Sequence, residues 1–101
     1  MLFRSPDTPP TVLRKAYPDY PLEVRASGLQ GIVSLSATIG TDGIPKDIQV
    51  LSAPPGGGSD EAALRAAALR AAGLWRFAPA RDHSGRPVES PVTLQMTFRL
   101  M

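Results

Sequence analysis

The sequence contains no cysteine and a single histidine, His83. Without cysteine, neither a disulfide framework nor a thiolate metal site can form, so packing must hold the fold together. His83 lies in a loop bounded by glycine and proline, where no second histidine can complete a site, and we expect it to be solvated. No pair of carboxylates has a spacing that suggests acid/base chemistry. We therefore expect no metal, no cofactor and no enzymatic activity.

Long apolar runs and clustered basic residues are also missing. No apolar stretch approaches the ~18 residues of a membrane span, and the start of the chain lacks the apolar run of a signal peptide. We expect any anchor or export signal to lie outside this chain. The net charge is +2, and no four basic residues follow one another. A nucleic-acid binder would more often carry a clustered basic face with aromatic residues, so we predict no nucleic-acid partner.

A chain of 101 residues has room for one domain, and its eleven prolines exclude long helices from several stretches. Pro6, Pro9 and Pro10 make residues 1–15 an extended lead-in. This segment is either the end of a proline-containing linker or an arm packed along the domain. We expect the domain itself to span residues 16–101.

Alternation with a period of two indicates the first two strands. From residue 31 onward, apolar residues alternate with serine and threonine, which predicts a strand with one buried and one hydroxyl-rich face. The apolar residues are Val33, Leu35, Ala37 and Ile39. Asp42-Gly43 supplies the positive φ of a tight turn. The returning strand contains Ile44, Lys46, Ile48 and Val50, so the segment predicts a β-hairpin.

A short helix is predicted before the hairpin, over residues 21–27. Pro21 suits a first helical position, and Gly28 suits a left-handed cap. Helical spacing places Leu22, Ala26 and, just past the cap, Leu29 toward the core.

A second helix is predicted after the hairpin, over residues 60–74. It follows a run of three glycines, and Ser59 or Asp60 is positioned to cap its first N–H groups. Its core-facing stripe consists of Leu64, Ala68, Ala71 and Trp75. No lysine with a serine or threonine follows the glycines, so we interpret them as a linker rather than a phosphate-binding loop.

Beyond the second helix, Trp75 and Phe77 alternate with Arg76, which places both aromatic rings in the core. Residues 78–91 contain three prolines and a glycine and are predicted to form a loop. The last segment, residues 92–100, alternates without a break and predicts a half-buried strand. Its apolar positions are Val92, Leu94, Met96, Phe98 and Leu100, and its polar positions are Thr93, Gln95, Thr97 and Arg99.

Together these elements predict a two-layer α+β fold. A three-stranded antiparallel sheet in the spatial order 2-1-3 would be covered on one face by the two helices. The final strand then lies at a sheet edge, and its unpaired backbone groups invite a further strand. No proline or lysine protects residues 92–100. We therefore predict a binding module that acts through the backbone of its last strand.

Several sequence features, in this order along the chain, are typical of one known family. They are Tyr20-Pro21 before the first helix, Gly31, Asp42-Gly43 at the turn, and above all Trp75-Arg76-Phe77-Ala78-Pro79-Ala80, then Gly85-Arg86-Pro87-Val88 and Phe98 in the last strand. The run from residue 20 to residue 100 resembles the C-terminal domain of TonB, the energy transducer of Gram-negative bacteria. The resemblance covers about four fifths of the chain.

The resemblance implies a TonB/TolA C-terminal-like fold in the periplasm. It implies binding of the TonB box of a TonB-dependent outer-membrane transporter, added as a strand to the sheet edge. The implied core motif is Trp75, Phe77 and Pro79. The candidate contact residues are Tyr20, Pro21, Val92, Thr93, Leu94, Gln95, Met96, Thr97, Phe98 and Arg99. In the family, an ExbB/ExbD-type motor in the inner membrane pulls through a membrane helix and a tether to drive siderophore and vitamin uptake.

Two other functions stay open. The edge can pair with itself, which would make the chain a homodimerisation module. The same type of domain is also appended to other envelope proteins, such as membrane peptidases of the sensor type, where it would act as an accessory domain. The glycine run at 56–58 and the early start of the second helix depart from the family pattern, but neither touches the edge strand.

Overall fold

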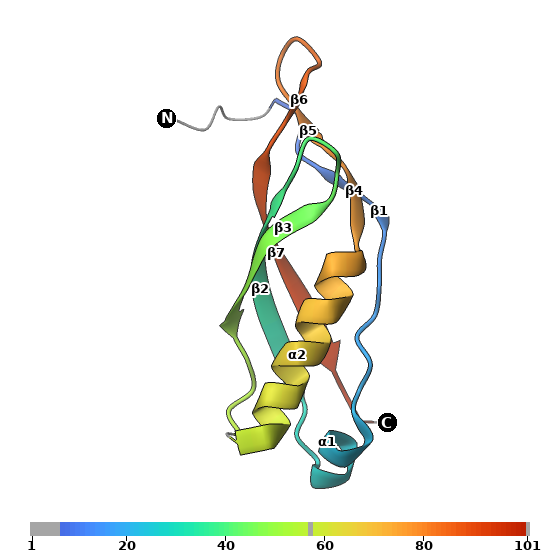
Figure 1. Cartoon of the computed structure of the whole chain (residues 1–101), viewed down its shortest axis with the longest axis vertical. Helices are drawn as coiled ribbons and strands as arrows, with labels where there is room; N and C mark the ends of the chain where they lie inside the picture. The colour runs from blue at the N-terminus through green and yellow to red at the C-terminus, as the bar shows by residue number, and fades with distance from the viewer. Residues whose placement is uncertain (1–6, 57, 101) are drawn as a thin grey trace.

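A three-stranded antiparallel sheet forms the base of the fold in the computed structural model, which describes residues 7–56 and 58–100. Its strands are β2 (Gly31–Ile39), β3 (Pro45–Ser52) and β7 (Ser90–Phe98), in the spatial order β3-β2-β7. The predicted order 2-1-3 is therefore confirmed. Figure 1 shows an elongated molecule in which both helices lie on the same side of this sheet.

The central strand β2 and the edge strand β7 alternate between core and solvent as their sequences predict. In β2, Val33, Leu35 and Ile39 are fully buried, and the serines and threonine between them are partly exposed. β7 pairs with β2 over nine consecutive residues, from Gly31 opposite Phe98 to Ile39 opposite Ser90, without a bulge. The β2–β3 ladder, in contrast, shifts register twice. The predicted hairpin is confirmed, and β7 is held along its whole length on one side.

Helix α1 (Leu22–Ser27) ends at Gly28, which has the predicted left-handed conformation with a φ of 83°. The expected core face of this helix is wrong. Val24 is its buried residue, whereas Leu22 is 75 % exposed and Ala26 is also exposed. Each helical residue turns the chain by about 100°, so positions 22 and 26 lie roughly opposite position 24. Because Val24 is buried, Leu22 and Ala26 face the solvent. Leu29 packs against the core as expected.

Helix α2 (Gly58–Leu74) begins two residues earlier than predicted, so Ser59 and Asp60 lie inside its first turn rather than before it. The predicted stripe is correct, because Leu64, Ala68 and Ala71 are buried and Trp75 is 8 % exposed. Small alanine side chains on this stripe let α2 lie close to the sheet. Within the described residues, no helix is long and apolar enough to cross a membrane.

The predicted loop over residues 78–91 contains short strands instead. These are β4 (Arg76–Ala78), β5 (Ala80–Arg81) and β6 (Pro87–Val88), and β7 already begins at Ser90 and ends at Phe98. β5 and β6 form a small antiparallel hairpin. Strands of two or three residues are too short to show a period, and Pro87 lies at the first position of β6, where proline is tolerated.

The segment before α1 runs along the body of the domain as an arm. Strand β1 (Thr11–Arg14) pairs antiparallel with β4, and Thr8 bridges to Arg81. Figure 1 shows the arm continuing past α2 toward α1 on the same side of the molecule. Of the lead-in at residues 1–15, residues 1–6 lie outside the described part of the chain.

Candidate partner-binding edge

Strand β7 lies at an edge of the sheet. Within residues 7–56 and 58–100 its one ladder partner is β2, so its other side has no paired strand. The side chains of Leu94, Met96 and Phe98 are buried under the helices. The alternate residues are exposed on the other face of the sheet, which no helix of the described residues covers; they are Thr93, Gln95 and Thr97, with Arg99 just beyond the strand.

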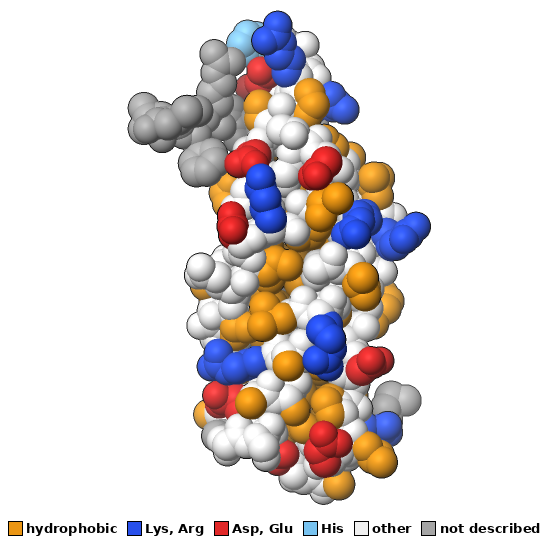
Figure 2. Space-filling model, in the orientation of Figure 1, with side chains coloured by type: hydrophobic (Ala, Val, Ile, Leu, Met, Phe, Trp, Pro, Cys, Tyr) orange, Lys and Arg blue, Asp and Glu red, His pale blue; other side chains and the backbone are white. Residues whose placement is uncertain are grey.

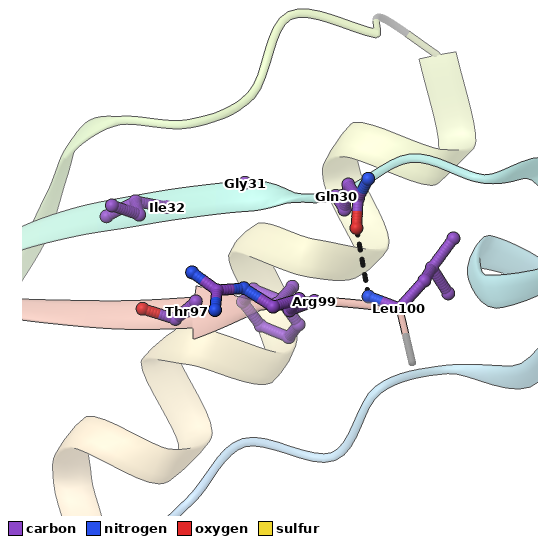
Figure 3. A pocket seen from close by; sticks show the side chains of 7 residues that line it. Gln30, Gly31, Ile32, Thr97, Arg99 and Leu100 are labelled. Carbon is purple, nitrogen blue, oxygen red and sulfur yellow. Dashed lines mark hydrogen bonds between the residues drawn. The ribbon is translucent and has the colours of Figure 1, made fainter.

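Two hydrogen bonds establish which backbone groups point away from β2. The N–H of Leu100 donates to Oε1 of Gln30 at 2.9 Å, on the β2 side, as Figure 3 shows. Across β2, the N–H of Gly40 donates to the carbonyl of Ile44 at 3.1 Å, on the β3 side. In an antiparallel strand the N–H and C=O of one residue point to the same side, and successive residues alternate.

Both bonds lead to the same assignment. Because Gly40 faces β3, the odd-numbered residues of β2 face β7, and they lie opposite even-numbered residues of β7. Even-numbered residues of β7 direct their backbone groups to β2, and odd-numbered residues direct theirs to the free edge. We call Thr93, Gln95, Thr97 and Arg99 the outward residues. Pro91 has the same parity but no N–H to donate. The edge available for pairing therefore runs from residue 93 to residue 99.

A groove of about 250 Å³ lies between this edge and the arm, and we call it the edge groove. The arm contributes Lys15, Ala16, Tyr17 and Pro18, and the body contributes Trp75, Gln95, Met96 and Thr97. The indole N–H of Trp75 donates to the carbonyl of Ala16 at 2.8 Å, and the Lys15 ammonium lies 5.8 Å from the centre of the indole ring. Trp75 thus holds the arm as the second wall of the groove.

Tyr20 and Pro21, two of the predicted contact residues, lie at the end of β7 and do not line the edge groove. The Tyr20 ring packs edge-on against Phe98, with centroids 5.4 Å apart, and its hydroxyl donates to the carbonyl of Leu29. The Pro21 carbonyl accepts the first hydrogen bonds of α1. The two residues fix the corner where the strand meets α1.

The core-motif residues connect the groove to the hairpin turn. The rings of Trp75 and Phe77 stack with centroids 6.0 Å apart and are 8 % and 5 % exposed. The N–H of Phe77 donates to the carbonyl of Gly43 at 3.0 Å. Pro79 lies between β4 and β5 and is partly exposed. The position of Trp75 therefore depends on the turn between β2 and β3.

The remaining polar candidate lies on the small β5–β6 hairpin. His83 is exposed at the tip of the β5–β6 hairpin, and the described residues include no group of histidine, aspartate and glutamate that could hold a metal. Next to it, the Ser84 hydroxyl and the Arg86 N–H donate to the Asp82 carboxylate, at 2.7 and 3.0 Å. These bonds, led by the one from Ser84, lower the pKa of Asp82 to about 2. The arrangement stabilises a turn.

Charge is spread over the molecule without a basic patch on the face drawn in Figure 2. There, lysine and arginine alternate with aspartate and glutamate along the length of the domain, and apolar side chains lie between them. Within the described residues, the ion pairs are Lys46 with Glu89 and Arg65 with Glu61.

Sequence reasoning missed the contribution of the arm to the groove. The signal available was the pair of Tyr-Pro dipeptides, Tyr17-Pro18 and Tyr20-Pro21, since a residue before proline favours an extended backbone. An extended segment alone does not reveal what it lies against. The hydrogen bond between Trp75 and Ala16 joins residues 59 positions apart, and no local pattern encodes it.

Comparison with known proteins identifies a family and a similar solved structure. Residues 16–100 match the model of the Gram-negative bacterial TonB protein C-terminal family. A solution NMR structure of the Pseudomonas aeruginosa TonB CTD is similar to this chain, with 31 % identity and a TM-score of 0.71. That similarity covers 93 % of this chain and 89 % of the other. No curated protein sequence is significantly similar.

Proposed function

Because the chain belongs to the Gram-negative TonB protein C-terminal family, we propose that it binds the TonB box of an outer-membrane transporter as an added strand on β7. The observation that carries the proposal is the unpaired side of β7, with its four outward residues. Strand addition uses such an edge, with main-chain hydrogen bonds supplying affinity and alternate side chains supplying specificity.

The size of the edge suits a releasable contact. Each main-chain hydrogen bond contributes about 0.5–1.5 kcal/mol net, and the cost of ordering a flexible peptide offsets part of the sum. The edge groove adds apolar contact on one side of the added strand, since Trp75, Met96 and Pro18 line it. Side chains of the partner that face the helices would enter this groove, and the intervening ones would lie on the open face.

In this function the domain works in the periplasm and passes force to the transporter. The pull would come from an ExbB/ExbD-type motor in the inner membrane, which uses the proton gradient, and the transported compounds would be siderophores or vitamins. The chain itself acts as a non-enzymatic adaptor. Its role is to grip the transporter segment and hold it while the arm is pulled.

The experiment that tests strand addition is a titration of the ¹⁵N-labelled domain with a TonB-box peptide. We expect the amide signals of the outward residues to shift first and the amides that face β2 to shift less. Gln95→Pro removes one outward N–H while the ladder to β2 keeps all its bonds, because proline is tolerated on an edge. Gln95→Ala is the matched control.

We expect Gln95→Pro to bind the peptide about five- to tenfold more weakly than Gln95→Ala, which corresponds to one hydrogen bond. Shifts confined to α2 or β3 would refute pairing at β7. Equal binding by the two variants would show that the Gln95 amide takes no part.

Self-pairing of the same edge is the second candidate. An edge without a paired strand on one molecule fits the same edge of a second copy, related by a twofold axis. Sedimentation over a range of concentrations separates the two functions, since a stable dimer would cover the outward residues. A role as an accessory domain of an envelope peptidase would be recognised from the sequence upstream of the domain in the gene, where a zinc-protease His-Glu-x-x-His motif would favour it.

A further inference from the structure

A second hollow, of about 470 Å³, lies at the far end of the free edge, where β2 begins and β7 ends. Its lining consists of Gln30, Gly31, Ile32, Thr97, Phe98, Arg99 and Leu100. Figure 3 shows the side chain of Arg99 pointing back along β7 toward Thr97. The hollow therefore adjoins the edge and holds a guanidinium beside the last outward positions.

Among the described residues that line this hollow, Arg99 is the only charged one, and none carries a carboxylate. Within the described residues the ion pairs lie elsewhere, between Lys46 and Glu89 and between Arg65 and Glu61. A guanidinium carries five N–H donors in a planar fork that matches a carboxylate. From its described residues, the hollow thus offers a positive charge with hydrogen-bond donors and no acidic side chain.

We propose that Arg99 selects partner strands that carry a carboxylate side chain on the open face of the sheet, beside Thr97. This inference rests on the proposed strand addition at β7. It adds a chemical requirement for the partner: an aspartate or glutamate at a defined position of an otherwise extended, partly apolar segment.

The geometry of an added strand limits where that carboxylate lies. A partner residue directly opposite Thr97 shares its face of the sheet, about 5.5 Å away between Cα atoms, and is diagonal to Arg99. The next residue of the partner points to the other face, into the edge groove, where Lys15 lies over the Trp75 ring. Arg99 therefore recognises alternate positions of the partner, and Lys15 is the cation near the positions between them.

The test is a set of TonB-box peptides in which one glutamate is moved through successive positions, each compared with a glutamine peptide. Binding is measured at low salt for the parent chain, Arg99→Gln and Arg86→Gln. Arg86 is a matched control, because it is exposed and lies on the distant β5–β6 hairpin. The ¹⁵N amide signals of the outward residues are followed in the same titrations.

We expect the parent chain to prefer glutamate over glutamine about two- to fivefold at one or two positions of the same parity, which is the size of an exposed cross-strand charge pair. Arg99→Gln should lose this preference and bind the glutamate and glutamine peptides equally. Arg86→Gln should keep it. A preference that survives in Arg99→Gln, or an equal loss for both kinds of peptide, would overturn the inference.

The two proposals fail separately in this experiment. If the amide signals of the outward residues shift but no preference for glutamate depends on Arg99, the carboxylate requirement is refuted and strand addition is supported. If no peptide shifts the outward amides, strand addition itself falls, and the inference falls with it.

Discussion

Gly43 in the β2–β3 turn gives a sharp test of how the turn supports the site. Its φ is 80°, and a Cβ built at this position would lie 1.9 Å from the carbonyl oxygen of Phe77. The Gly43 carbonyl also accepts the N–H of Phe77 at 3.0 Å. Gly43→Ala must therefore push β4 away from the turn, and the neighbouring Trp75, which holds the arm, should move with it.

The expected cost has two parts. A left-handed backbone costs an alanine about 1–2 kcal/mol. Loss of the buried hydrogen bond to Phe77, with both groups left unpaired, adds about 1–3 kcal/mol. We expect Gly43→Ala to lower the free energy of unfolding by about 3–4 kcal/mol. For a domain of this size, about 4–8 °C per kcal/mol translates this into a fall in Tm of roughly 15–30 °C.

Gly28→Ala is the control, because Gly28 has a φ of 83° but a Cβ there would meet no atom within 4 Å. It isolates the cost of the left-handed conformation, about 1–2 kcal/mol. Urea denaturation of the parent chain and both variants measures the difference. If Gly43→Ala costs no more than Gly28→Ala, the contact between the turn and β4 does not support the fold, and the link from turn to groove is wrong.

Three further predictions concern the edge, the arm and the small hairpin. The N–H groups of the outward residues should exchange with solvent faster than those of Leu94, Met96 and Phe98 in the free domain, and uniform protection along β7 would contradict the edge assignment. Trp75→Phe removes the hydrogen bond to Ala16, so we expect about 1–3 kcal/mol less stability in urea and weaker peptide binding; unchanged binding would mean that the arm is not a wall of the site. Because the pKa of Asp82 is lowered to about 2 in the folded chain, its stabilising contribution is complete above about pH 4 and is lost as the pH falls toward 2. An NMR titration checks this, and a carboxyl midpoint near 4, or one that Ser84→Ala leaves unchanged, would count against the turn hydrogen bonds as its cause.

The sheet was predictable because its strands are long enough to show a period. Nine residues of β2 and nine of β7 alternate between core and solvent, and each alternation identifies both the strand and its buried face. The order of strands then follows from chain connectivity, since a helix carries the chain back along the sheet between β3 and β7. A helix of six residues makes fewer than two turns and shows no clear period, and the core face of α1 was predicted incorrectly.

The walls of the candidate site were not predictable in the same way. The edge groove needs an arm strand of four residues, a partner strand of three, and an indole hydrogen bond to Ala16. Each of these contacts joins segments about sixty residues apart, and none leaves a repeated pattern in the sequence. They form because the hydrogen bond between Phe77 and Gly43 fixes β4, which positions Trp75 next to Ala16 of the arm.

The two ends of the free edge define the segment that can occupy it. Pro91 carries no N–H at the first outward position, and beyond Arg99 the N–H of Leu100 already donates to Gln30. The pairing stretch from residue 93 to residue 99 spans roughly 20 Å at about 3.3 Å per residue. A partner therefore needs about seven extended residues, with apolar side chains toward the edge groove and, beside Thr97, a carboxylate toward Arg99. The groove is lined at residues 95–97 and the guanidinium lies beside Thr97. Truncating a bound peptide from the end next to Arg99 should therefore remove charge selectivity first and the groove contacts next, whereas truncation from the end next to Thr93 should first remove main-chain hydrogen bonds.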